Sequence, residues 1–199
     1  NNFDYNDSLT TMHWIKDNNH RHNIRTNAMI DKTLTSIGLS IKADLAYEKT
    51  DFLISQSGEM TQNHSHHAMA GLSTSFQKLS WLRLSAAITA NYYWERSSIR
   101  RSDVLSSYIT NAALYLFPSK NTELKIKFYN LTDGHYHTCG LLDANLNYKI
   151  NKVWEAGLTV TNLLNTTSYI TTQYTGINTF TSTLPLRNRE IMVHLQMRL

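Results

Sequence analysis

The sequence predicts an all-β protein whose strands run up and down in one antiparallel sheet. Apolar and polar side chains alternate at every second residue over most of the chain, and no segment repeats with the 3.6-residue period of a helix. The alternation is clearest in the last eleven residues, REIMVHLQMRL, whose apolar members are Ile191, Val193, Leu195, Met197 and Leu199. Because successive side chains of a strand point to opposite faces, such a strand has one apolar and one polar face.

The composition excludes several classes of protein. Hydrophobic residues make up 41% of the 199 and charged residues only 17%, against roughly 25% charged residues in soluble domains. The net charge of +4 is spread along the chain, which argues against a nucleic-acid-binding patch. No apolar run reaches the roughly 18 residues that a transmembrane helix needs. The single cysteine, Cys139, cannot form an internal disulfide and is expected to be a packing residue.

The N-terminal half is expected to hold five strands. The first lies near Leu9–Ile15, and the second, residues 22–33, alternates more weakly. The third, residues 37–48, alternates almost without interruption. The fourth, residues 66–78, is again weaker, whereas the fifth, residues 81–94, carries an apolar or aromatic side chain at each second position from Leu82 to Trp94.

Five more strands are expected in the C-terminal half. Residues 103–117 alternate weakly, and LKIKF at 124–128 places lysines between apolar residues. LLDANLNYKI at 141–150 and VWEAGLTV at 153–160 alternate clearly, and residues 189–199 form the tenth expected strand.

Tight and long connections alternate along this series. The tight ones are residues 35–37, 77–80, 118–122 and 151–152, and the long, polar ones are residues 55–66, 96–103, 131–137 and 166–185. This arrangement is typical of an up-and-down meander with short turns at one end and long loops at the other, so that the two ends face different environments.

Strand length and aromatic positions favour a membrane. The expected strands mostly run about ten to fifteen residues, whereas soluble strands average about five or six. Aromatic residues stand at both ends of the apolar faces, as they do at the two interfaces of a bilayer. They are Tyr47, Tyr92, Trp94 and Phe128 toward the long loops and Trp81, Phe117, Tyr148 and Trp154 toward the tight turns. The alternative is core packing in a soluble sheet, which would fold without detergent.

A sheet buried in lipid has to close, because an open edge in hydrocarbon leaves backbone groups unpaired at a cost of several kcal/mol each. We therefore expect residues 1–199 to form one segment of an antiparallel up-and-down transmembrane β-barrel. The charged side chains of the polar faces would then point into a wet or plugged lumen; they are Lys42, Asp44, Arg83, Lys125, Lys127, Asp143, Lys149, Glu155, Glu190 and Arg198.

Two stretches near the C-terminus carry a resemblance. LTVTNLLNTTSY at 158–169, followed by LPLRNREIMVHLQMRL at 184–199, resembles the end of TonB-dependent outer-membrane receptors, especially the type abundant in Bacteroidetes. The matching elements are the Asn-Leu-Leu-Asn run, the tyrosine after it, an arginine-bearing entry and a terminal amphipathic strand. They correspond to Asn162, Leu163, Leu164, Asn165, Tyr169, Arg187, Arg189 and residues 190–199, so the motif covers about forty residues.

The resemblance implies a place in the bacterial outer membrane and TonB-dependent uptake of a nutrient such as a siderophore, glycan, peptide or metal complex. Such a receptor has about twenty-two strands, together with an N-terminal plug domain and a segment that engages TonB. Because Asn1 opens in polar sequence without a signal peptide, we expect the C-terminal portion of such a barrel. The implied partners are outer-membrane lipid, the plug domain, TonB and the nutrient; no cofactor is expected.

Histidines gather in or beside the expected outer loops. The candidate ligand-binding residues are His64, His66, His67, His135 and His137, with His20 and His22 nearby in the same loop group. Imidazoles are good ligands for zinc, copper or nickel, and a His-x-His pair in an extended chain places both rings on one side. The alternative is that these histidines are ordinary solvated loop residues, and we assign no metal site to them.

A self-contained barrel, with a different function, would share most of these features. A self-contained ten-stranded barrel could act as a pore, an adhesin or a surface hydrolase, since ten is an even number of strands. For a hydrolase, Asp51, Asp133 and His135 would be the acid and base candidates. Because no nucleophile motif such as Gly-x-Ser-x-Gly accompanies them, we expect no enzyme activity.

Overall fold

The computed structural model describes residues 2–5, 12–15, 21–56, 59–97, 104–133, 138–175 and 178–197. They form thirteen strands and, within these ranges, no helix, so none of the described segments could cross a membrane as a helix. The strands are β1 (Asn2–Tyr5), β2 (Met12–Ile15), β3 (His22–Leu34), β4 (Leu39–Gln56), β5 (Glu59–Leu79), β6 (Leu82–Ser97), β7 (Leu105–Ser119), β8 (Thr122–Asp133), β9 (Thr138–Lys149), β10 (Trp154–Thr161), β11 (Ser168–Thr175), β12 (Asn178–Pro185) and β13 (Glu190–Met197).

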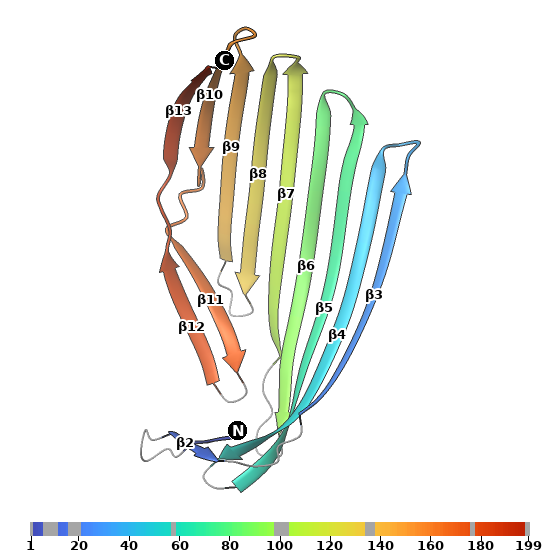
Figure 1. Cartoon of the computed structure of the whole chain (residues 1–199), viewed down its shortest axis with the longest axis vertical. Helices are drawn as coiled ribbons and strands as arrows, with labels where there is room; N and C mark the ends of the chain where they lie inside the picture. Colours follow the sequence, from blue (N-terminus) through green and yellow to red (C-terminus); the bar gives the residue numbers. More distant parts are fainter. Residues whose placement is uncertain are drawn as a thin grey trace.

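Nine strands, β3 to β10 and β13, form one antiparallel sheet in which strands follow one another in chain order (Figure 1). β3 occupies one edge, where it pairs only with β4, and β13 pairs with β10 at the other edge. Because each of the eight neighbouring pairs is antiparallel, the first and the ninth strand run in the same direction. No ladder between β3 and β13 exists among the described residues.

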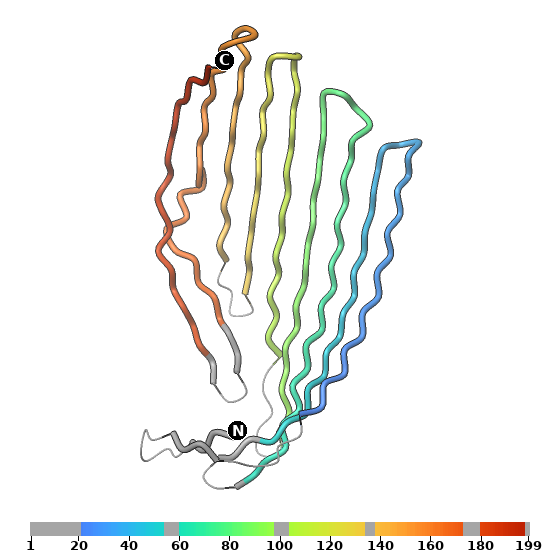
Figure 2. The backbone as a smooth tube through the Cα atoms, in the orientation of Figure 1, coloured from blue at the N-terminus to red at the C-terminus, as the bar shows by residue number. Residues whose placement is uncertain are grey.

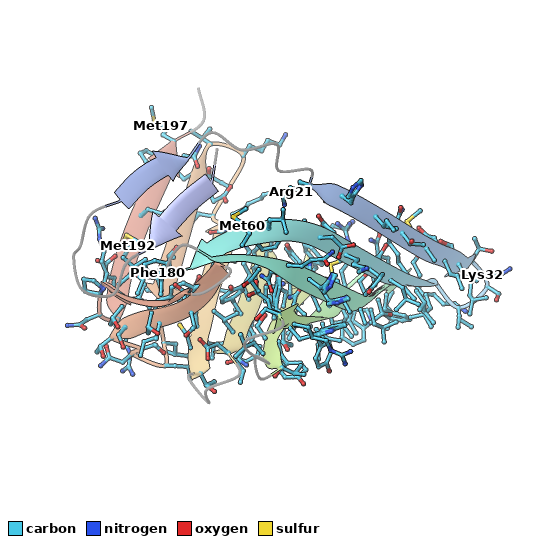
Figure 3. All side chains as sticks on the ribbon, turned by 90° about the horizontal axis from the view of Figure 1, so that it is seen from below. Arg21, Lys32, Met60, Phe180, Met192 and Met197 are labelled. Carbon is cyan, nitrogen blue, oxygen red and sulfur yellow. The ribbon has the colours of Figure 1, made fainter. Side chains whose placement is uncertain are left out.

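The sheet is curved rather than flat. Seen from below, it forms an open trough with β3 on one side and β13 on the other (Figure 3). The short hairpin of β1 and β2 joins this sheet through a parallel contact of β1 with Ser55 and Gln56, at the far end of β4. Curvature of this kind is what a wall of a barrel requires.

Long, nearly unbroken registers determine which side chains share a face. One row of paired residues crosses eight strands, and all of its members are apolar: Leu39, Phe76, Leu84, Leu114, Ile126, Ala144, Val160 and Ile191. The adjacent row consists of the following or preceding residue on each strand and is polar or small: Ser40, Ser75, Ser85, Ala113, Lys127 and Asp143. The sheet therefore has an apolar face and a polar face.

No other layer formed by the described residues covers the apolar face. Among the described residues only two hydrophobic side chains are buried, Leu131 and Cys139, so the packing role expected for Cys139 is confirmed. Large hydrophobic residues of the apolar face are exposed instead; they include Ile24, Ile30, Ile41, Leu45, Leu72, Leu84, Ile88, Leu146, Leu158, Ile191, Val193 and Leu195. Soluble proteins rarely expose contiguous apolar patches larger than a few hundred Å².

The tight turns lie together at the end of the sheet where the chain also ends (Figure 2). The turn between β3 and β4 depends on Gly38, which has a φ of 68°, and a Cβ there would lie 2.7 Å from the backbone nitrogen of Lys78. The carbonyl oxygen of Gly38 accepts a 2.9 Å hydrogen bond from the amide of Gln77. Glycine is thus required by both conformation and space.

The last hairpin is broken in the middle. β10 pairs with β13 and β11 pairs with β12, but the chain leaves the ladder over residues 162–167 and 186–189, where its trace bends (Figure 2). β11 and β12 consequently form a separate two-stranded sheet beyond the long-loop end of β10.

The prediction of an all-β antiparallel up-and-down sheet is confirmed, whereas closure into a barrel and the count of about twenty-two strands stay predictions. Among the described residues the sheet holds nine long strands instead of about ten, because β2, in the expected Leu9–Ile15 strand, pairs there with β1 alone. The expected loops at 55–66 and 166–185 are largely strand, as β5 and as β11 with β12. Phe117 lies on the polar face, where the guanidinium of Arg83 is 5.2 Å from its ring centroid.

Candidate functional site

The polar face contains a hollow near the middle of the sheet. Its volume is about 570 Å³, and its lining comes from seven consecutive strands, β3 to β9. The floor is made of small side chains in two adjacent rows, Ser73 with Ala87 and Ser75 with Ser85 and Ala113. Because small residues leave room above the backbone, the hollow is a consequence of the sequence at these positions.

Charged residues stand on both sides of this floor. Asp31 is opposite Lys42 in the ladder of β3 and β4, and Lys127 is opposite Asp143 in the ladder of β8 and β9. Lys42 also pairs with Asp44, at 3.4 Å between nitrogen and oxygen. The hollow therefore offers charges of both signs around hydroxyl groups, an arrangement suited to a polar ligand or a polar polypeptide surface and unsuited to an apolar one.

A second, smaller hollow of about 230 Å³ lies on the same face toward the tight turns. Arg83, Glu123, Asn147, Lys149 and Glu155 contribute to its lining. The two hollows together place charged groups along much of the polar face. All the charged residues that the sequence assigned to the lumen lie on this face, except Arg198, which is outside the described residues.

The candidate histidines do not come together. His64 and His66 lie on the apolar side of β5, as the His-x-His spacing predicts, whereas His67 lies on the polar side. His135 and His137 are outside the described residues. In the described part of the chain no group of three or more histidine, cysteine, aspartate or glutamate side chains could hold a metal ion.

His66 belongs to an aromatic cluster at the border of the apolar face. Its ring stacks on the Trp94 ring with 5.1 Å between centroids and an angle of 3°. Its Nδ1 shares a 2.7 Å hydrogen bond with the hydroxyl of Tyr47. Tyr47, on β4, and Trp94, on β6, were expected at a lipid interface, and His66 joins them from the strand between.

His64 lies one step further from the apolar band and bonds to a carboxylate. Its Nδ1 donates a 2.6 Å hydrogen bond to Asp51, whose other oxygen accepts a 3.0 Å bond from Nζ of Lys49. These two hydrogen bonds, that from His64 first, lower the pKa of the Asp51 carboxyl below its ordinary value. Asp51 thus serves as the acceptor of a small charged network.

His67 faces the other way and is held by two polar-face neighbours. It stacks on Tyr93 with 4.1 Å between centroids and an angle of 7°, and its Nε2 is 3.4 Å from the Oδ1 of Asn91. The three histidines of one strand therefore belong to two environments, and only His67 is on the same side as the hollows.

The Asn-Leu-Leu-Asn run forms the corner at which the chain leaves the ladder. Asn162 and Asn165 have φ values of 51° and 56°, in the left-handed region that asparagine tolerates better than most residues. The side chain of Asn162 donates 2.8 Å hydrogen bonds to the carbonyls of Thr166 and Arg187 and accepts a 2.9 Å bond from the amide of Thr166. Asn165 accepts a 3.0 Å bond from the amide of Arg189.

This corner is tied to the main sheet as well. The backbone amide of Asn162 donates to a carboxylate oxygen of Asp143 at 2.8 Å, and the amide of Leu163 donates to the carbonyl of Leu142 at 2.7 Å. The hydroxyl of Thr166 donates to the carbonyl of Gly140. The residues that carried the resemblance therefore have an architectural role here: they fix where β11 and β12 extend beyond the long-loop end of the sheet.

A scan against protein-family models and searches of curated proteins and of solved structures found no match to this chain. Its function has to be inferred from the geometry of the sheet.

Proposed function

We propose that this chain is part of the wall of a bacterial outer-membrane β-barrel, and that the barrel is a TonB-dependent nutrient receptor. The observation that carries the first step is the uncovered apolar face of the sheet. A soluble protein would bury these side chains, since full burial of a large aliphatic side chain stabilises by about 1.5 to 3 kcal/mol. Lipid hydrocarbon is the environment in which they can remain on the outside.

The polar face supports a lumen. Its two hollows and its charged rows would be costly to bury in a dry core, whereas water or a polar domain can solvate them. In a receptor of the family that the C-terminal motif resembles, a plug domain occupies this position. The polar face would supply the wall against which the plug lies, and nutrient would pass along it.

The strand directions favour a barrel with further strands over direct closure of these nine. β3 and β13 run in the same direction, so direct closure between them would need a parallel pair. Antiparallel closure needs an odd number of additional strands, and a barrel of about twenty-two strands meets that condition. A ten-stranded barrel meets it too, with one further strand, so what favours the receptor over a ten-stranded pore, adhesin or hydrolase is the resemblance of residues 158–199.

Surface accessibility tests the membrane topology. An epitope inserted between β6 and β7, at the long-loop end, should be reached by antibody on intact cells, whereas one inserted at Lys120, in the tight turn between β7 and β8, should be reached only after the outer membrane is permeabilised. Recovery of the protein in the soluble fraction, or equal labelling of the two epitopes, would contradict the proposal.

Energy dependence tests the receptor step separately. Growth of the source bacterium on limiting iron, glycan or peptide sources should fall when the gene is deleted, and deleting TonB in the intact strain should reproduce the same defect. A growth defect that does not depend on TonB would favour a passive pore, and the absence of any defect over these nutrient classes would remove the uptake proposal.

A further inference from the structure

The apolar face changes character just beyond its aromatic residues. Three successive rows of paired residues cross β3, β4, β5 and β6 near the long-loop end. The first row holds Thr26, Tyr47, Ala68 and Tyr92; the second holds Ile24, Lys49, His66 and Trp94; the third holds His22, Asp51, His64 and Arg96. Hydrophobic side chains thus give way to cations and imidazoles within two rows on one face.

The balance of charge on these two outer rows is positive. Lys49 and Arg96 are set against a single carboxylate, Asp51, and three histidines add hydrogen-bonding capacity. On the opposite face of the same strands, Arg25 lies opposite Glu48, and Glu95 on β6 adds a second carboxylate. We call Lys49, Arg96, His22, His64 and His66 the cationic rim.

The height of the cationic rim matches a headgroup layer. Tyrosine and tryptophan rings prefer the level at which hydrocarbon meets headgroups. Lys49 is two residues beyond Tyr47, and Arg96 is two residues beyond Trp94, a rise of about 7 Å along each strand. Their side chains therefore emerge where the phosphate groups of the outer leaflet would lie.

Three of the five rim residues, Lys49, His64 and His66, are held in place before any ligand binds. The Asp51 carboxylate fixes both Nζ of Lys49, at 3.0 Å, and the ring of His64, at 2.6 Å. His66 is held between the Tyr47 hydroxyl and the Trp94 ring, and it lies near enough to Lys49 and Arg96 to be influenced by their charges. Arg96 itself is exposed. Pre-positioned donors lose less conformational entropy on binding.

We propose that the cationic rim binds the phosphate groups of an anionic lipid of the outer leaflet. This inference rests on the proposed membrane location and adds to it a specific lipid contact. The occupant is a lipid and not a soluble phosphate compound, because the cations adjoin an apolar surface that would hold the acyl chains of the same molecule.

Reconstitution into vesicles of two compositions tests this proposal. The full-length protein would be refolded into two kinds of vesicle, one of phosphatidylcholine alone and one of phosphatidylcholine with diphosphorylated lipid A. Its unfolding temperature in each kind of vesicle, and its partitioning between the two kinds, would be measured. The double variant Lys49→Gln with Arg96→Gln removes both fixed cations. The matched control is Arg25→Gln, which removes a cation at the same height from the opposite face.

The wild type and Arg25→Gln should both prefer the vesicles that contain lipid A, and the double variant should lose about 30-fold of that preference. An unchanged preference in the double variant, or an equal loss in the control, would contradict lipid binding by the cationic rim. Excess inorganic phosphate should not abolish the preference; if it does, the rim binds free phosphate and the lipid proposal is wrong. If the protein inserts into neither kind of vesicle, both the proposed membrane location and the proposed lipid binding by the cationic rim are wrong.

Discussion

The two faces of the sheet are made by the same strands, yet they differ in what can cover them. Along β5, Leu72 is 51% exposed on a face of aliphatic side chains, while the next residue, Ser73, lines the polar hollow. A soluble sheet usually covers its apolar face with a second layer, and here that face is uncovered. The difference supports the proposal that lipid covers one face, whereas water or a polar domain covers the other.

Introducing a charge at two neighbouring positions, one on each face, should give the largest difference between the faces. Leu72→Arg places a guanidinium in the middle of the apolar band and should destabilise the folded protein in lipid by about 2 to 4 kcal/mol. Ser73→Arg, one residue away on the polar face, should change the free energy of unfolding by less than about 1 kcal/mol. Urea titrations in phospholipid vesicles give both values, and equal losses would mean that the two faces share one environment.

The corner at Asn162 lies where the chain leaves the sheet, so its side chains no longer divide between an apolar and a polar face. Asn162→Ala removes three side-chain hydrogen bonds and places alanine at a φ of 51°. We expect a loss of about 2 to 3 kcal/mol. Protease cleavage within β11 and β12 should also accelerate, whereas cleavage elsewhere should not. A variant with unchanged stability and cleavage would show that the corner does not hold the hairpin.

Packing on the polar face should give a smaller effect. A Cβ at Gly157 would overlap the ring of His194 and lie 2.8 Å from Oδ1 of Asn147, whereas a Cβ at Gly71 has nothing closer than 3.6 Å. Because the His194 ring can rotate away, Gly157→Ala should cost about 1 kcal/mol. Gly71→Ala is the control and should be neutral or slightly stabilising. Equal results in thermal unfolding would contradict the packing described for β10 and β13.

Titration of the Asp51 network should give the smallest effect. Because the folded pKa of Asp51 is lowered, the ionised carboxylate stabilises the protein above its ordinary pKa of 3.8, and this contribution is lost as the pH falls through the lower, folded pKa. Asp51→Asn should therefore lower the unfolding midpoint slightly at neutral pH, with a difference that vanishes in acid. A difference that persists in acid below the folded pKa of Asp51 would mean that Asp51 acts by another route.

Sequence periodicity predicted most of the sheet, because each strand that contacts two different environments has to alternate. The prediction from periodicity failed at two segments, β11 with β12 and β2. The sequence predicts a loop at 166–185, where β11 and β12 lie, because SYITTQYT and NTFTSTLP are dominated by threonine and other polar residues, so that alternation between two environments is weak. The strand expected near Leu9–Ile15 is described only over Met12–Ile15, as β2, and its pairing with β1 could not be predicted because local pattern says nothing about pairing partners.

The candidate site was less predictable. Clustering of histidines along the sequence could not show that His67 faces away from His64 and His66, although the odd spacing was a usable signal. The hollow depends on Ser73, Ala87 and Ala113 being adjacent across strands, which requires the register. Asn162 and Asn165 could be recognised as a motif, but their left-handed conformation and long-range hydrogen bonds could not be derived from it.

The most direct test of the central claim is the accessibility of spin labels on adjacent residues of β6. In a background of Cys139→Ala, labels at Leu84→Cys and Ser85→Cys would be measured in lipid vesicles against molecular oxygen, which concentrates in hydrocarbon, and against a water-soluble nickel chelate. The account predicts that the label at 84 responds mainly to oxygen and the label at 85 mainly to nickel. Equal access of the nickel chelate to both labels would contradict a lipid-facing wall.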